Sequence, residues 1–213
     1  MNNIKGLIFD LDGVLLSTDK FHYLAWKKLA DRMGIEFTEK DNERLRGVSR
    51  MESLEIVLSL KPSVKLSEEE KLAVATEKNE CYREYLMTLT PDYVSDEVRA
   101  TLASLREKGY RLAVGSSSKN TRFILEKTQL TDSFDAIADG NDIKNSKPDP
   151  EVFLKAAELI AVAPEHCAVI EDAEAGLEAA RAGKMLAIAY ASAYGSELGD
   201  LQLKKFSDLG DIF

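Results

Sequence analysis

Apolar and polar positions fall in blocks along the chain, and the first block is a short apolar run. Leu7, Ile8 and Phe9 are consecutive apolar residues, and the run stops at Asp10. A continuous apolar run of this length, bounded by a polar residue, is typical of a strand buried on both faces of a sheet. We therefore predict a buried strand that ends at a carboxylate.

Helical spacing of apolar residues dominates the segment that follows. It predicts helices over 21–33, 54–61 and 67–89. The last begins at Ser67 with Glu70 three residues on, which is the pattern of a capping box. Because connections between a strand and a helix are normally short, so long a helical stretch after one strand indicates an inserted domain.

From Pro91 onward, strand and helix patterns alternate. Such alternation is typical of a parallel sheet with helices on both faces. The fold class we predict is α/β, a doubly wound parallel sheet (Rossmann-like core) with an inserted α-helical cap domain. The predicted strands are 111–115, 134–138, 167–170 and 185–189, and the predicted helices are 97–108, 120–128, 150–160 and 173–182. The predicted domains are 1–16 with 90–213 for the core, and 17–89 for the cap.

Composition and charge narrow the class of partner. The formal net charge of −9 argues against a nucleic-acid binder, which normally presents a basic face. No apolar run approaches the length of a membrane span, and the chain passes from Met1 into the first strand without room for a signal peptide. We expect a cytoplasmic protein that binds neither nucleic acid nor membrane.

Two carboxylates mark the end of the first strand. If the extended backbone continues past Asp10, then Asp10 and Asp12 point to the same side, and Gly13 allows the chain to turn away. Two ionised carboxylates in a small space repel each other, so the pair suits a magnesium site, an acid/base pair, or both. The alternative is an Asp-rich turn without chemistry.

Polar clusters at other element ends should converge with this pair, because ligands gather at the carboxyl ends of parallel strands. The run Ser116 to Asn120 stands at a helix N-terminus and could bind an anion, or simply cap the helix. Lys147 lies beside two prolines, although most lysines are merely solvated. Glu171 and Asp172 could join Asp10 around magnesium, or Asp172 could cap the next helix.

The inserted segment holds further candidates. His22 and Trp26 lie four residues apart on one helical face. The simpler interpretation is a surface histidine and a core-packed tryptophan, and for Trp26 we favour packing. Lys78 and Arg50 have a solvated position as the simpler interpretation. Arg50 follows a short loop with a glycine, which could carry its planar guanidinium onto a phosphate.

Taken together, these residues resemble the four motifs of the haloacid dehalogenase superfamily, in the same order. The motifs are Asp10-Leu11-Asp12-Gly13-Val14, the hydroxyl cluster from Ser116, Lys147-Pro148 and Glu171-Asp172. The inserted segment is similar to the β-phosphoglucomutase-like family within it. That likeness rests on His22, Trp26, Leu45-Arg46-Gly47-Val48-Ser49-Arg50 and Lys78-Asn79.

The resemblance implies a set of catalytic roles. Asp10 would be the nucleophile that forms an aspartyl-phosphate, and Asp12 the general acid/base. Mg²⁺ would be held by Asp10, the backbone carbonyl of Asp12, and Asp172, with Glu171 close to the ion or bound to it. His22 and Lys78 would link the closed cap to the position of Asp12.

It also implies how the substrate is bound. Ser116 and Lys147 would hold the transferring phosphate, and Arg50, Ser118 and Asn120 the second phosphate of a bisphosphate intermediate. The remaining expected substrate-binding residues are Trp26, Arg46, Gly47, Val48, Ser49, Lys78 and Ser117. Ser17, Arg46 and Ser117 depart from the family pattern without removing a catalytic group.

The implied activity is a phosphomutase that interconverts β-D-glucose 1-phosphate and D-glucose 6-phosphate through β-glucose 1,6-bisphosphate. We expect a monomer whose partners are these sugar phosphates. A magnesium-dependent sugar-phosphate phosphatase is the first alternative. A phospho-aspartate signalling module is the second, although a switch needs no lid over its phosphate.

Overall fold

The first apolar run forms β1 (Gly6–Phe9), which lies in the middle of a parallel sheet in the computed structural model. The structure describes residues 3–45 and 48–213. Within them the strand order is β3-β2-β1-β4-β5-β6 and every paired neighbour is parallel. This confirms the predicted doubly wound α/β fold. The other strands are β2 (Arg111–Gly115), β3 (Ala136–Ala138), β4 (Cys167–Glu171), β5 (Leu186–Tyr190) and β6 (Leu201–Leu203).

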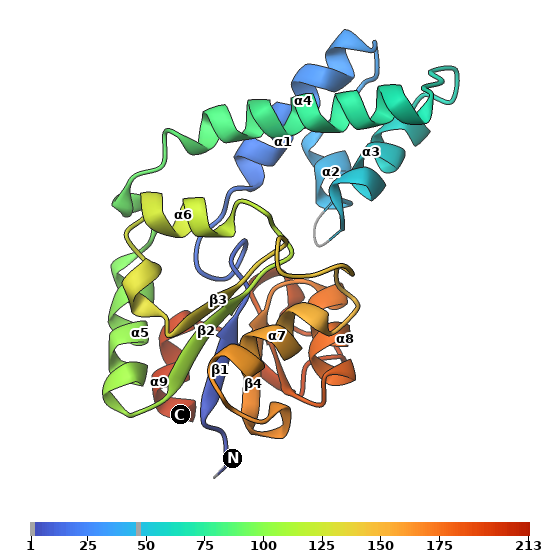
Figure 1. The fold of residues 1–213 in the computed structure, drawn as a ribbon. Coiled ribbons are helices and arrows are strands. Elements are labelled where there is room, and N and C mark those ends of the chain that lie inside the picture. Colours follow the sequence, from blue (N-terminus) through green and yellow to red (C-terminus); the bar gives the residue numbers. More distant parts are fainter. Residues whose placement is uncertain (1–2, 46–47) are drawn as a thin grey trace. The chain divides into compact units, whose positions relative to one another are not determined.

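Helices cover both faces of the sheet (Figure 1). Four of them follow strands or lead into them: α5 (Asp96–Glu107), α6 (Thr121–Lys127), α7 (Glu151–Leu159) and α8 (Glu174–Ala182), and the chain ends in α9 (Leu209–Ile212). On one face, Ile8 packs among buried residues of α7 and α8. On the other, the ring of Phe9 contacts those of Phe134 and Phe206. Alternate residues of β1 thus supply two separate apolar layers, which is why its sequence is apolar throughout.

The inserted segment is helical and has a core of its own. Its helices are α1 (Asp19–Arg32), α2 (Glu39–Glu43), α3 (Arg50–Ser59) and α4 (Glu68–Leu86). Trp26, Phe37 and Leu54 lie at the centre of this core, each almost fully buried. The capping box predicted at Ser67 and Glu70 is confirmed, with the Ser67 amide donating to Glu70 Oε2 at 2.7 Å.

The chain divides into two compact units. The sheet unit comprises Met1–Ser17 with Thr90–Phe213, and the helical unit comprises Thr18–Leu89. Ser17, predicted to open the inserted segment, falls in the sheet unit. Short elements without a strong periodic pattern, α2, β6 and α9, were not predicted.

Candidate active site

The carboxyl ends of four strands place polar groups at one edge of the sheet. The amide of Asp10 donates to Ile170 O at 3.1 Å, and the amide of Ser116 donates to Ala138 O at 3.1 Å. These bonds extend the strand ladders by one residue beyond β1 and β2. The backbone at both positions is therefore fixed by the sheet, as the strand-end rule predicts.

Lys147 joins two of these strand ends. Its Nζ donates to Asp10 Oδ1 at 2.5 Å and to Glu171 Oε1, and it lies 4.6 Å from the centre of the Phe153 ring. The side chain is buried. Burial alone would lower the pKa of Lys147, but the charges of Asp10 and Glu171 outweigh it and raise that pKa. The ammonium group therefore stays protonated. The solvated interpretation of Lys147 is wrong, because the side chain is buried and bonded to two carboxylates.

The two carboxylate oxygens of Glu171 accept hydrogen bonds from different groups. Oε1 accepts from Lys147, and Oε2 accepts from the amides of Asp172 (2.9 Å) and Ala173 (3.0 Å), just before α8. No side chain caps α8 at Ala173. The interpretation of Asp172 as a helix cap is therefore wrong, because Glu171 already accepts the amides at this turn.

Asp10, Glu171 and Asp172 form a carboxylate cluster. One oxygen from each lies within 4.8 Å of the others. Burial and neighbouring carboxylates raise the pKa of Glu171 to about 7 despite Lys147, and burial and Asp10 raise that of Asp172 to about 6. Three carboxylates and one ammonium group leave excess negative charge. Oxygen donors with such an excess fit a hard divalent cation such as Mg²⁺.

Gly13 and Ser192 both lie against the Asp172 carboxylate. Gly13 has φ of +88°, and a Cβ there would lie 2.1 Å from Asp172 Oδ2. The predicted sharp turn at Gly13 is thus confirmed, and it brings backbone against this carboxylate. Ser192 Oγ donates to Asp172 Oδ2 at 2.9 Å. Ser192 was missed by the sequence reasoning, and its position soon after β5 is the one signal that could have found it.

The serine run forms a tight turn. Ser116 Oγ accepts from the Ser118 amide (3.3 Å), and Ser118 Oγ accepts from the Asn120 amide (3.2 Å). Asn120 is the N-cap of α6, without a side-chain cap bond. The serines are thus not helix caps, and accepting these bonds leaves their hydroxyl protons available for a ligand. Among the described residues, the buried Ser117 Oγ has no hydrogen-bond partner.

The helical unit brings together His22 and Lys78. Lys78 Nζ lies 2.7 Å from His22 Nδ1, and over the rings of Trp26 (5.2 Å) and Tyr82 (4.7 Å). Lys78 is only 3% exposed, so the solvated interpretation is wrong for it. Burial, then the charges of Lys78 and Arg50, lower the pKa of His22 well below its ordinary range. His22 is therefore a neutral imidazole beside an ammonium group, and Trp26 is packed in the core.

Arg50 is the first residue of α3. Its Nη2 donates to Asn79 Oδ1 at 2.9 Å, and burial lowers its pKa. Ser49 caps the helix in a capping box with Glu52. Val48 is exposed. Arg46 and Gly47, which were expected to bind substrate, lie outside the described residues.

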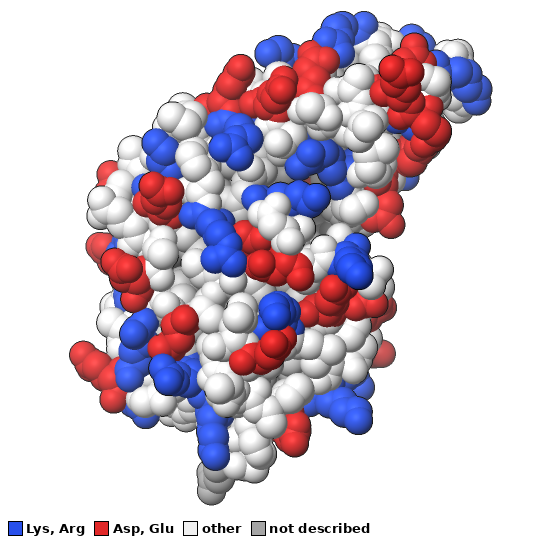
Figure 2. Space-filling model, in the orientation of Figure 1, with Lys and Arg blue, Asp and Glu red and all other residues white. Residues whose placement is uncertain are grey.

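The distribution of surface charge and the character of the helices bear on the predictions about nucleic acid and membranes. On the face drawn in Figure 2, acidic and basic side chains are interspersed rather than gathered into one basic stripe. Within residues 3–45 and 48–213, none of the helices combines the length and apolarity needed to cross a membrane.

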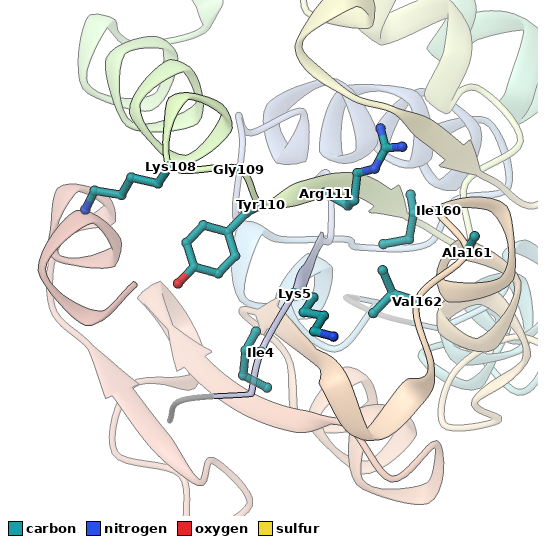
Figure 3. Close-up of a pocket in the computed structure, with 9 residues that line it drawn as sticks. All are labelled: Ile4, Lys5, Lys108, Gly109, Tyr110, Arg111, Ile160, Ala161 and Val162. Carbon is teal, nitrogen blue, oxygen red and sulfur yellow. The ribbon is translucent and has the colours of Figure 1, made fainter.

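A separate hollow of about 470 Å³ lies at the opposite, amino ends of β1 and β2 (Figure 3). Two of its cations already have partners: Arg111 pairs with Asp135, and Lys108 donates to Gly210 O. It holds none of the carboxylates described above. Its lining residues are Ile4, Lys5, Lys108, Gly109, Tyr110, Arg111, Ile160, Ala161 and Val162.

Known proteins resemble this chain over most of its length. The family model described as haloacid dehalogenase-like hydrolase matches residues 4–184. The β-phosphoglucomutase of Bacillus subtilis is 38% identical, over 97% of this chain and 92% of the relative. A phosphorylated carbohydrates phosphatase of Thermotoga maritima is 32% identical, over 84% of this chain and 81% of the relative. The crystal structure of β-phosphoglucomutase from Clostridium difficile superposes with a TM-score of 0.89 at 36% identity, covering 97% of this chain and 93% of that one.

Proposed function

We propose that this chain, which belongs to the haloacid dehalogenase-like hydrolase family, is a phosphomutase that interconverts β-D-glucose 1-phosphate and D-glucose 6-phosphate. The observation that carries the proposal is Asp10 at a strand end, bonded to Lys147 and clustered with Glu171 and Asp172. Similarity to the Bacillus subtilis β-phosphoglucomutase supports the choice of sugar and of a mutase.

Magnesium is the cofactor that the cluster suits. Asp10, Asp172 and the backbone carbonyl of Asp12 would hold the ion, with Glu171 beside it or bound to it. When bound, Mg²⁺ supplies positive charge that offsets the repulsion between the Asp10 carboxylate and the substrate phosphate.

Asp10 is the proposed nucleophile. Its carboxylate oxygen attacks phosphorus, the bond from phosphorus to the sugar oxygen breaks, and an aspartyl-phosphate forms. Asp12 donates a proton to the departing oxygen. In the second half, Asp12 takes a proton from the attacking sugar hydroxyl, and the Asp10 carboxylate leaves. Ser116 and the Lys147 ammonium group hold the phosphoryl oxygens, where charge develops.

The second phosphate of β-glucose 1,6-bisphosphate needs its own contacts. We assign it to Arg50, Ser118 and Asn120. The Arg50 guanidinium is held by Asn79 but retains other donors, and a planar donor of this kind suits phosphate. His22, with Lys78 beside it, is the proposed link between the helical unit and Asp12. The remaining sugar contacts, at Trp26, Val48, Ser49 and Ser117 and at the undescribed Arg46 and Gly47, stay predictions, as do the monomeric state and the cytoplasmic location.

A sugar-phosphate phosphatase is the second candidate, and the Thermotoga maritima phosphatase favours it. The two differ only in whether sugar or water accepts the phosphoryl group from Asp10. The test supplies β-glucose 1-phosphate, magnesium and a trace of the bisphosphate, and follows glucose 6-phosphate and free phosphate separately. We expect glucose 6-phosphate to dominate. Free phosphate without glucose 6-phosphate would refute the mutase.

Two variants sharpen this test. Asp10→Asn should lower both product rates by a factor of ~10³ or more, because the nucleophile is lost. Arg50→Ala should lower glucose 6-phosphate formation by about tenfold to a hundredfold and spare any phosphate release, since a single phosphate monoester does not need the second contact. Arg44→Ala is the matched control, because Arg44 is exposed at the end of α2 and should leave both rates unchanged.

A further inference from the structure

We propose that Ser192 is a positioning residue that orients the Asp172 carboxylate for the divalent cation. This inference depends on the proposed function in one respect, namely that Asp172 is a ligand of the cation. Ser192 Oγ lies 2.9 Å from Asp172 Oδ2 and 3.0 Å from Asp172 O. A group bonded to a ligand in this way fixes its orientation and its basicity.

The strand order explains why a distant residue reaches this carboxylate. β5 is the parallel neighbour of β4, with Glu171 opposite Ala189. A short 3-10 helix, Ala191–Ala193, follows β5 at the same edge of the sheet. It starts with Ala191 at φ of +48°, an uncommon conformation for a residue with a side chain. The turn places Ser192 beside the end of β4 although twenty residues separate it from Asp172.

Asp172 belongs to a close group of carboxylates. One oxygen from each of Asp10, Glu171 and Asp172 lies within 4.8 Å of the others, so all three can face one cation only if the Asp172 carboxylate keeps a fixed orientation. Gly13 backs the carboxylate, since a Cβ there would lie 2.1 Å from Oδ2. The bond from Ser192 and the close approach of Gly13 therefore restrict the orientation of the Asp172 carboxylate within the cluster.

A purely structural role for Ser192 makes a different prediction. Its bond to Asp172 O could simply fasten two turns together, in which case its loss would lower stability and leave cation affinity unchanged. Because Ser192 is exposed, water can replace its hydroxyl without leaving a buried group unsatisfied. We therefore expect unfolding of the cation-free protein to change little on Ser192→Ala.

The experiment titrates the cation-free 213-residue chain with Mn²⁺ and follows free Mn²⁺ by electron paramagnetic resonance. Ser192→Ala should raise the Mn²⁺ dissociation constant about tenfold, and Ser192→Thr, which keeps the hydroxyl, should restore it to within about threefold. Ser196→Ala is the matched control, because Ser196 Oγ in the same segment accepts from the Leu198 amide instead. The Ser196→Ala variant should bind Mn²⁺ with the same dissociation constant as the unchanged protein.

Kinetics give a second readout. The Mg²⁺ concentration for half-maximal rate should rise about tenfold in Ser192→Ala, while kcat at saturating Mg²⁺ stays within about twofold. Unchanged Mn²⁺ affinity in Ser192→Ala, or an equal loss in Ser192→Thr or Ser196→Ala, would overturn the positioning role alone. Failure of the unchanged protein to bind Mn²⁺ would overturn both this role and the proposed magnesium dependence.

Discussion

Gly176 lies in α8 against the Glu171 carboxyl group, and its missing side chain makes room for the cluster. A Cβ at Gly176 would lie 2.0 Å from Glu171 Oε1 and from its carboxyl carbon. Gly176→Ala gains about 1 kcal/mol of helix propensity but forces a buried side chain to move, which typically costs 1–3 kcal/mol. We expect a net loss of thermal stability and at least about a tenfold loss of activity, measured by calorimetry and by the coupled glucose 6-phosphate assay.

Gly210→Ala is the control for this substitution. Gly210 also lies in a helix, α9, and a Cβ there would meet nothing within 4 Å. Its stability should stay equal or rise slightly. If Gly176→Ala behaved like Gly210→Ala, the packing of Glu171 against α8 would not matter for the site.

Lys147 holds two buried carboxylates together. Lys147→Met keeps the length of the side chain but leaves Asp10 and Glu171 without their shared cation. Breaking a buried pair in this way costs about 3–5 kcal/mol. We expect this variant to be inactive and less stable. Magnesium should raise its unfolding temperature by more than it raises that of the unchanged chain, because without the Lys147 ammonium group the ion offsets more negative charge. Lys155→Met breaks only the exposed Lys155–Glu158 pair and should change stability by less than about 0.5 kcal/mol.

Sequence reasoning located the site residues whose position follows from a strand end. Asp10, Ser116 and Glu171 each end or follow a strand of the sheet, so topology alone brings them to one edge. It could not find Ser192, because a single serine between two alanines after a strand carries no periodic signal. It also could not predict that Glu171, rather than Asp172, accepts the hydrogen bonds of the backbone amides before α8, since both carboxylates are close to these amides along the chain.

At the scale of elements, capping boxes start three helices of the helical unit, α2, α3 and α4. Ser67→Ala and Ser49→Ala each remove the side-chain acceptor of such a box, at α4 and α3. Each should lower the free energy of unfolding by about 1 kcal/mol. Ser67→Ala should leave the mutase rate unchanged. Ser49→Ala should lower that rate, because Arg50 is the first residue of α3, and stability and rate measured on the same samples separate the two effects.

Element prediction worked where apolar spacing was long and regular. The spacing that predicted 67–89 corresponds to α4, and 111–115 coincides with β2. It failed for β6 and α2, which are too short to show a repeated apolar pattern. Leu201–Leu203 is recognised as a strand only through its pairing with β5, and α2 depends on the capping box of Thr38 and Asp41. Tertiary pairing and local hydrogen bonds, rather than periodicity, define these elements.

At the scale of the whole molecule, the acidic cluster couples folding to pH and to magnesium. In the cation-free protein the pKa of Glu171 is raised from 4.5 to about 7, and that of Asp172 from 3.8 to about 6. Between these values the folded state binds more protons than the unfolded state. Stability from these groups is therefore fully present below about pH 4, and is lost as pH rises to about 7.

Magnesium should reverse this loss, because the ion binds the charged carboxylates and protons compete with it. We expect magnesium to raise the unfolding temperature more at pH 8 than at pH 5, measured by calorimetry against samples in a chelator. Asp172→Asn removes one of the two titrating carboxyls and should shrink the effect of magnesium at pH 8. An equal magnesium effect at both pH values would show that Glu171 and Asp172 do not titrate in this range, and that the ion is not held by their charged forms.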